Sequence, residues 1–182
     1  MKIEKRSLSL YIHIPFCRIR CDYCDFNTYA GMDDFLNEYV DAVCKELEYF
    51  SENFSNDHFV HTIYFGGGTP TILPAILYEK ILNSINDHFQ MADEVEISSE
   101  ANPANVEFEY INGLWKAGIN RLSIGMQSAL EKELEILGRS QKLSDVKDAV
   151  RNAKKAGINN INLDLIFGIP TQTVESFKIS IQ

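Results

Sequence analysis

The feature that most constrains the fold is a regular alternation of strand-like and helix-like segments. Short strand-like runs, the first of which alternates apolar and polar residues, are each followed by a longer stretch with apolar residues at helical spacing. The predicted strands cover residues 8–14, 62–65, 95–100, 121–125 and 161–167. The predicted helices cover 33–50 (with Asp33 as the N-cap), 75–89, 106–117, one or two stretches within 131–156, and a start after 173. Such alternation requires parallel strands with crossover helices, as a doubly wound sheet or a barrel.

A short internal repeat supports stacked βα units. The sequence Lys-Ala-Gly-Ile-Asn occurs at 116–120 and again at 155–159, each time between a predicted helix and a predicted strand. Glycine suits the left-handed residue that ends a helix, and the isoleucine opens the next strand. The unusual residues of the sequence also follow predicted strand ends, which is where a parallel barrel carries its chemistry.

Composition excludes several classes of protein. The 182 residues are 45% hydrophobic and carry a formal net charge of −9, so the chain is globular and not disordered. No apolar run of about 18 residues predicts a membrane span, and the N-terminus lacks a secretory signal. A sequence pI near 4.9 argues against a nucleic-acid partner. We expect one soluble, cytoplasmic domain.

Three of the four cysteines lie on one predicted loop. Cys17, Cys21 and Cys24 fall within eight residues, and Arg18 and Arg20 between them are expected to lower the thiol pKa values. Buried thiols are one alternative, and a structural zinc is another, although zinc takes four ligands and no second cysteine pair exists. Three thiolates can instead hold three irons of a [4Fe–4S] cluster and leave the fourth iron open. We favour this open cluster, and we expect the fourth cysteine, at position 44, to lie in the core.

The segment that carries these cysteines also resembles a known family. Tyr11-Ile12-His13-Ile14-Pro15-Phe16-Cys17, followed by Cys21 and by Tyr23-Cys24, resembles the opening of radical S-adenosylmethionine (SAM) enzymes. More narrowly, it is similar to the oxygen-independent coproporphyrinogen III oxidase family, which includes haem chaperones of the HemW type. The resemblance implies an α/β fold, a partial (βα)6 TIM-like barrel with about five βα units. Residues 1–182 would form an incomplete radical SAM core, with the sixth strand and the C-terminal domain outside this chain.

The resemblance also implies the cofactor chemistry. The open iron would chelate the amino and carboxylate groups of SAM. One electron from the cluster would then cleave SAM to methionine and a 5′-deoxyadenosyl radical, which abstracts hydrogen from a substrate. An electron donor of the flavodoxin or ferredoxin type is implied as a partner.

Nine further residues are candidates for binding SAM. A triple glycine lets backbone N–H groups approach an anionic ligand, although it also suits a tight turn. Glu100 could cap the turn after its strand, the glutamine at 127 could be a solvated loop amide, and the arginine at 139 could simply lie near a helix end. A carboxylate inside an apolar strand, as at Asp164, is costly unless it is partnered. By family match all of these contact SAM, with Asp164 on the ribose and Tyr23 on adenine. The candidates are Tyr11, Tyr23, Gly67, Gly68, Thr69, Glu100, Gln127, Arg139 and Asp164.

The family divides in function, and the sequence favours one branch. The oxidases, which decarboxylate two propionates of coproporphyrinogen III, carry a further cysteine two residues after the third cluster cysteine, where this chain has Phe26. The oxidases also carry a longer N-terminal extension, whereas the first predicted strand of this chain starts at residue 8. Both features favour a chaperone that binds haem and transfers it to a partner protein. One residue argues against the chaperone function: this chain has Gln141 where the chaperone branch usually has histidine. The alternatives are the oxidase, acting on a porphyrin substrate in haem biosynthesis, and a zinc or purely structural βα domain; no catalytic residue is assigned.

Overall fold

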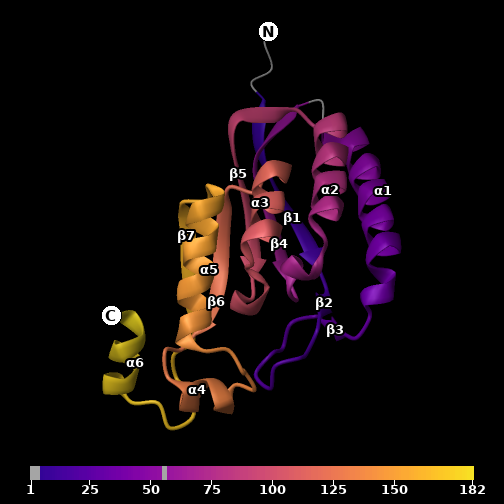
Figure 1. Cartoon of the computed structure of the whole chain (residues 1–182). Helices are drawn as coiled ribbons and strands as arrows, with labels where there is room; N and C mark the ends of the chain where they lie inside the picture. Colours follow the sequence, from indigo (N-terminus) through magenta and orange to yellow (C-terminus); the bar gives the residue numbers. More distant parts are fainter. Residues whose placement is uncertain (1–4, 55–56) are drawn as a thin grey trace.

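The computed structural model describes residues 5–54 and 57–182. Its main sheet has five parallel strands that lie side by side in the order of the sequence (Figure 1). They are β1 (Arg6–Ile14), β4 (His58–Gly67), β5 (Met91–Ala101), β6 (Arg121–Gln127) and β7 (Asn160–Leu165). A two-residue pair, β2 (Phe16–Cys17) with β3 (Tyr29–Ala30), closes the base of the cysteine loop. The α/β class and the five strands are confirmed.

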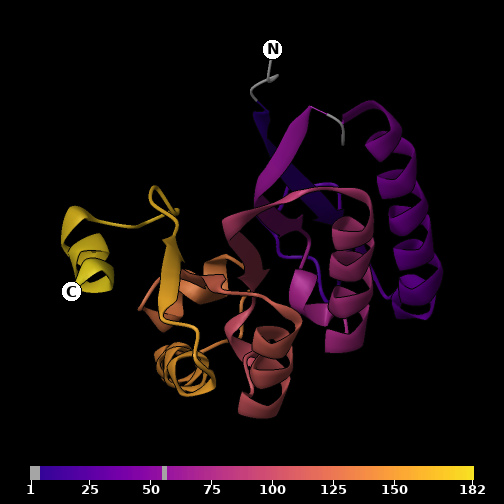
Figure 2. The same ribbon diagram turned by 90° about the horizontal axis from the view of Figure 1, so that it is seen from above.

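Four helices lie along the outer side of this arc of strands (Figure 2): α1 (Leu36–Phe54), α2 (Ala75–His88), α3 (Phe108–Ala117) and α5 (Leu143–Ala156). The short α4 (Glu131–Ile136) lies at the carboxyl ends of the strands (Figure 1), and α6 (Val174–Ile181) follows β7. Short 3-10 turns are η1 (Asp33–Phe35), η2 (Pro70–Ile72) and η3 (Pro103–Asn105). Because the strand order never reverses, the sheet is the arc of a barrel and not a doubly wound sheet. No helix within residues 5–54 and 57–182 is long and apolar enough to cross a membrane.

Two helix starts differ from the sequence prediction. Asp33 is not an N-cap, because it opens η1, and α1 begins three residues later at Leu36. Similarly, α3 begins at Phe108 and not at 106, since Pro103 starts a 3-10 turn first. The last strand is shorter than predicted and ends at Leu165. At both helix starts a 3-10 turn therefore precedes the α-helix.

The two Lys-Ala-Gly-Ile-Asn joints adopt the same geometry, as predicted. Gly118 and Gly157 follow helices with φ of 116° and 110°, the left-handed conformation that glycine tolerates best. In each joint the next isoleucine is fully buried, and its N–H donates to a carbonyl of the last helical turn at 3.0 Å. The repeat therefore gives α3 and α5 the same connection to the strand that follows each of them.

The two faces of the sheet differ sharply. The helix-facing side is apolar, with Ile63, Phe65 and Leu122 fully buried. The opposite, inner side is polar, because the strand register places hydroxyl, amide and charged residues next to one another on neighbouring strands. Hydrogen bonds cross this side, from Thr62 to Ser9 at 2.8 Å and from Arg121 to Ser98 at 3.1 Å, for example. A parallel sheet normally buries both faces in apolar residues, so the polar inner side indicates a place for water and ligands.

Candidate cofactor site

A cavity of about 340 Å³ lies where the carboxyl ends of the strands meet the cysteine loop. Eleven of the twelve residues predicted as ligands line it. They are Cys17, Cys21, Cys24, Tyr23, Gly67, Gly68, Thr69, Glu100, Gln127, Arg139 and Asp164. The segments that carry them run from the cysteine loop to β7, so only the fold brings these residues together.

The cysteine loop is held at Cys17 and again at Cys24. Cys17 lies in β2 and is buried, and the Cys24 N–H donates to the Cys21 carbonyl at 3.1 Å. The guanidinium of Arg20 donates to the Cys24 carbonyl at 3.2 Å. The expected lowering of thiol pKa values is wrong for Cys17, whose pKa is raised by burial and then by the neighbouring thiols. The arginine charge does not offset that burial.

The thiols form a set suited to a cluster. All four cysteines are free, and no three His, Cys, Asp or Glu side chains among the described residues converge as ligands of a single ion. Cluster cysteines each bind a different iron, so their sulfurs need only surround one volume, as these three do. Cys44 lies on α1 away from the cavity and packs against the core, as predicted.

Glycine is required where the second strand meets the cysteine loop. Gly67 has a φ of 119°, and a Cβ there would lie 2.6 Å from the His13 ring. A Cβ on Gly68 would lie 2.6 Å from the Phe16 carbonyl oxygen and 3.0 Å from the Cys17 sulfur. The next residue, Thr69, places its hydroxyl 3.6 Å from the same sulfur. The glycines therefore let the strand end touch the cysteine loop directly.

Substituting Gly68 with alanine is expected to displace Cys17. The added methyl group would overlap a backbone oxygen that no rotamer change can move, so the strand or the loop must shift at a cost of about 1–3 kcal/mol. We expect a lower Tm and a lower iron content after reconstitution, both measured against wild type. A Gly68→Ala protein with unchanged Tm and iron content would show that the contact is not required.

Glu100 is held in the cavity by two donors. Its carboxylate accepts a hydrogen bond from the Tyr64 hydroxyl at 3.0 Å and one from the Gly67 N–H at 3.0 Å. Burial, followed by the Glu100 charge, raises the pKa of Tyr64, so the phenol remains a donor. The turn after β5 is capped by Asn102, which accepts from the Ala104 N–H at 3.1 Å. The capping alternative for Glu100 is therefore excluded, and its carboxylate points into the cavity.

Asp164 is partnered, as a carboxylate in a strand must be. One of its oxygens accepts from the Ser123 hydroxyl at 2.9 Å and from the Asn162 amide at 2.6 Å. The Asn162 amide also donates to Ser123 at 3.0 Å, so the three side chains together fix the orientation of the carboxylate. Asp164 lines the cavity, and its second oxygen has no hydrogen-bond partner among the described residues, so it can accept from a diol there.

The side chains of Gln127 and Arg139 both lie close to Gly125. Gln127 ends β6, is 9% exposed and adopts a φ of 65°, which is unusual for a residue with a Cβ. The solvated-loop alternative for Gln127 is therefore wrong. The Arg139 guanidinium donates to the Tyr23 hydroxyl at 2.9 Å and so connects this side of the cavity to the cysteine loop. A Cβ on Gly125 would lie 2.8 Å from the Gln127 amide nitrogen and 3.5 Å from the Arg139 guanidinium.

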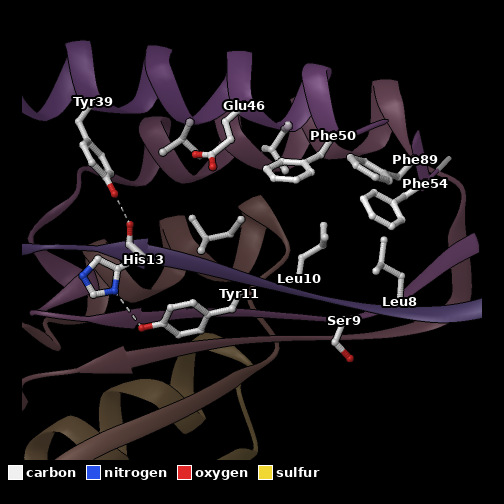
Figure 3. Close-up of a pocket in the computed structure, with 13 residues that line it drawn as sticks. Leu8, Ser9, Leu10, Tyr11, His13, Tyr39, Glu46, Phe50, Phe54 and Phe89 are labelled. Carbon is white, nitrogen blue, oxygen red and sulfur yellow. Dashed lines mark hydrogen bonds between the residues drawn. The ribbon is translucent and has the colours of Figure 1, made fainter. Parts of the chain in front are cut away.

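Tyr11 is the predicted residue that the structure does not bring to this cavity. It is 59% exposed and lies on the inner side of β1, away from α1, where its hydroxyl is 3.0 Å from the His13 ring (Figure 3). Its ring stacks on that of Tyr64 at 6.2 Å, and Tyr64 does line the cavity. His13 contacts the Asn27 carbonyl at 3.0 Å, so its ring connects β1 to the segment after the cysteine loop.

Several lining residues escaped the sequence analysis. Tyr64, Ser123 and Ile166 contribute to the cavity wall, and Gln141 lies behind it. Tyr64 and Ser123 sit on the same face of their strands as Glu100, so the two-residue period of a strand could have identified them. In the sequence Gln141 stands out only as a departure from the chaperone branch, because its contacts with the end of β6 depend on the fold.

The residues present fit a cluster and SAM. The cavity is lined by the three thiols, by the carboxylates of Glu100 and Asp164 and by the Arg139 guanidinium. The triple glycine does not offer free backbone donors as predicted, because the N–H groups of Gly67, Gly68 and Thr69 already donate to Glu100, Ile14 and Phe16. The Arg139 Nε is buried and has no hydrogen-bond partner within residues 5–54 and 57–182, so this guanidinium retains a donor. SAM carries an ammonium, a carboxylate and a ribose diol, and each of these groups has a complementary partner here.

The comparisons with known proteins agree with this site. Residues 11–182 match the Radical SAM superfamily. The chain therefore belongs to the radical SAM superfamily.

Two named relatives are similar to this chain over almost its whole length. The "Heme chaperone HemW" of Haemophilus influenzae is 40% identical over 172 residues, covering 92% of this chain and 45% of that protein. The oxygen-independent coproporphyrinogen III oxidase of Escherichia coli is 32% identical over the full 182 residues, which is 40% of its length. The solved structure of that oxidase (HemN) superposes with a TM-score of 0.89 over 97% of this chain and 41% of the oxidase chain. The chain spans less than half the length of these relatives, and its fold is that of the HemN radical SAM domain.

Proposed function

We propose that this chain binds a [4Fe–4S] cluster through Cys17, Cys21 and Cys24 and binds SAM in the adjoining cavity. The observation that carries the proposal is the convergence of eleven predicted ligands on one cavity. When bound, the cluster supplies the electron for reductive cleavage of SAM. The chain's own part is to hold SAM against the open iron.

The geometry assigns a role to each side of the cavity. Glu100 accepts from the SAM ammonium, while the Tyr64 and Gly67 donors keep its carboxylate in place. Asp164 accepts from the ribose diol through its second oxygen. Tyr23 presents its ring to adenine, with Arg139 holding its hydroxyl. Tyr11 supports this wall through Tyr64 and does not touch SAM directly.

We further propose that the protein is a haem chaperone of the HemW type. Relatives with this name are 40%, 37% and 39% identical in Haemophilus influenzae, Escherichia coli and Bacillus subtilis. Phe26 lines the cavity and is 67% exposed at the position where the oxidases carry a cysteine. Haem would be its ligand, a haem-accepting protein and a flavodoxin- or ferredoxin-like donor its partners, and the cytoplasm its location.

The oxidase is the second candidate function. The TM-score of 0.89 to the coproporphyrinogen III oxidase favours it over the other classes. Under this alternative the ligand is a porphyrinogen, and the 5′-deoxyadenosyl group of SAM is consumed with each decarboxylation. Haem binding without decarboxylation separates the chaperone from the oxidase.

Electron paramagnetic resonance on the reduced protein tests the cofactor proposal. We expect anaerobic reconstitution to give about four irons and four sulfides per chain and a [4Fe–4S] signal that changes shape when SAM is added. A cluster that does not respond to SAM, or stoichiometric zinc in place of iron, would contradict the proposal.

Haem titration and a coproporphyrinogen III assay then distinguish the two functions. A chaperone is expected to bind haem in stoichiometric amount and to form no vinyl product. Vinyl product formed with SAM and reductant would replace the chaperone assignment by the oxidase.

A further inference from the structure

Gln141 lies behind the cavity and uses three of its hydrogen-bonding positions. It is 7% exposed, and its amide nitrogen donates to the Gly125 carbonyl at 2.9 Å and to the Met126 carbonyl at 2.8 Å. Its amide oxygen accepts from the Arg139 guanidinium at 2.9 Å. Two carbonyls and a guanidinium fix the amide orientation, because the opposite orientation would place donor against donor and acceptor against acceptor.

These bonds hold a strained part of the backbone. The chain leaves the regular β6 ladder between Gly125 and Gln127, where the register to β7 shifts. Gln127 then adopts a φ of 65°, a conformation that costs about 1–3 kcal/mol for a residue with a Cβ and persists only when its surroundings fix it. The Ile166 N–H donates to the Gln127 carbonyl at 3.0 Å from the other side.

The same side chain also orients a cation of the cavity. Arg139 donates through one nitrogen to Gln141 and through the other to Tyr23, so the guanidinium is held between β6 and the cysteine loop. One planar amide thus determines where two cavity side chains lie, Gln127 through the backbone and Arg139 directly. Arg139 also donates directly to the Gly125 carbonyl, but at the longer distance of 3.5 Å.

We propose that Gln141 is a positioning residue of the SAM site, which sets Gln127 and Arg139 for binding without touching SAM. The proposal rests on the proposed function, because it needs SAM in this cavity. A glutamine serves here because it supplies two donors and one acceptor in one plane. Glutamate keeps the acceptor and loses both donors, and methionine loses all three while it keeps the length.

The test compares Gln141→Met and Gln141→Glu with wild type. The control is Gln172→Met. Gln172 also uses its amide on both sides: it donates to Glu133 at 2.9 Å and, at the longer distance of 3.4 Å, to the Ile166 carbonyl, and it accepts from the Gly168 N–H at 2.8 Å. Its own side chain does not line the cavity. For each reconstituted protein we would measure iron content, Tm, the SAM dissociation constant by calorimetry, and the SAM-induced change in the cluster signal.

The expected result separates positioning from stability. Gln141→Met and Gln141→Glu should weaken SAM binding about 10-fold, which corresponds to about 1.4 kcal/mol, and alter the SAM-bound signal while the SAM-free signal stays as in wild type. Gln172→Met should lower Tm and leave the SAM constant within about twofold.

Other outcomes overturn the inference. SAM constants within about twofold of wild type in folded Gln141 variants, or an equal loss in Gln172→Met, would contradict a positioning role. If both Gln141 variants fail to fold, Gln141 is a structural residue and the proposal is wrong. A wild-type protein that does not respond to SAM would overturn the proposed function as well, so the two failures are distinguishable.

Discussion

Replacing Cys21 with serine is expected to abolish the [4Fe–4S] cluster while the protein remains folded. Cys21 is half-buried on a loop, outside the apolar core between the sheet and helices, so the substitution removes little packing. A serine hydroxyl is a far poorer ligand for iron than a thiolate, and two remaining cysteines cannot hold a cubane with three protein-bound irons. Iron content should fall from about four per chain to below about one, with the Tm of the unreconstituted protein within a few degrees of wild type.

Cys44 provides the matched control. It is the fourth free cysteine, lies on α1 and packs against the core, with no contact to the cavity. Cys44→Ser should keep the full iron and sulfide content, measured by colorimetric assay and by the absorbance of the cluster. Full iron content in Cys21→Ser, or its loss in Cys44→Ser, would contradict the ligand assignment.

The architecture was largely predictable because it depends on local periodicity. The short apolar runs and the helical spacing predicted all five strands of the sheet and the crossover helices within a few residues. The choice between a doubly wound sheet and a barrel required the strand order, which no local pattern contains. Asp33 failed as an N-cap because a 3-10 turn precedes α1, and the entry of a helix onto a sheet is set by packing as well as by capping preference.

The site was predictable to the extent that the family resemblance names its residues. Glu100 and Asp164 follow or end strands of one parallel sheet, so they had to lie at one edge. Tyr11 shows the limit of that argument, because it lies one ring away from the cavity, behind Tyr64. Gln141 shows a second limit. Its amide nitrogen binds backbone carbonyls at the end of β6, where the register shifts, and no residue type in the sequence predicts that shift.

The sheet register explains why the polar residues lie together. On the inner side, Tyr64 pairs with Tyr11 on one neighbouring strand and with Ser98 on the other, and Glu100 pairs with Ser123. A one-residue slip would turn these side chains into the helix-facing core. The buried isoleucines and leucines of the alternate positions prevent such a slip, so the apolar core determines the geometry of the polar cavity.

Glu100→Gln is expected to weaken SAM binding roughly 10- to 100-fold while the fold is unchanged. The glutamine oxygen can accept from the Gly67 N–H, and its amide nitrogen can donate to the Tyr64 hydroxyl, so both present contacts have a neutral replacement. What disappears is the charge facing the SAM ammonium, and a hydrogen bond to a charged group contributes about 1.5–3 kcal/mol. Calorimetry with SAM on the reconstituted protein measures the loss.

Glu96→Gln separates this local effect from a general change in charge. Glu96 lies on the same strand and the same face, accepts from the Ser98 hydroxyl at 2.9 Å and lies 3.8 Å from Arg121, but does not line the cavity. Both substitutions change the net charge by the same amount, so a long-range electrostatic effect would weaken SAM binding similarly in the two variants. A loss confined to Glu100→Gln, with iron content and Tm unchanged, would place the SAM ammonium at this carboxylate. An equal SAM constant in wild type and Glu100→Gln would mean that the ammonium binds elsewhere in the cavity, and the assigned orientation of SAM would be wrong.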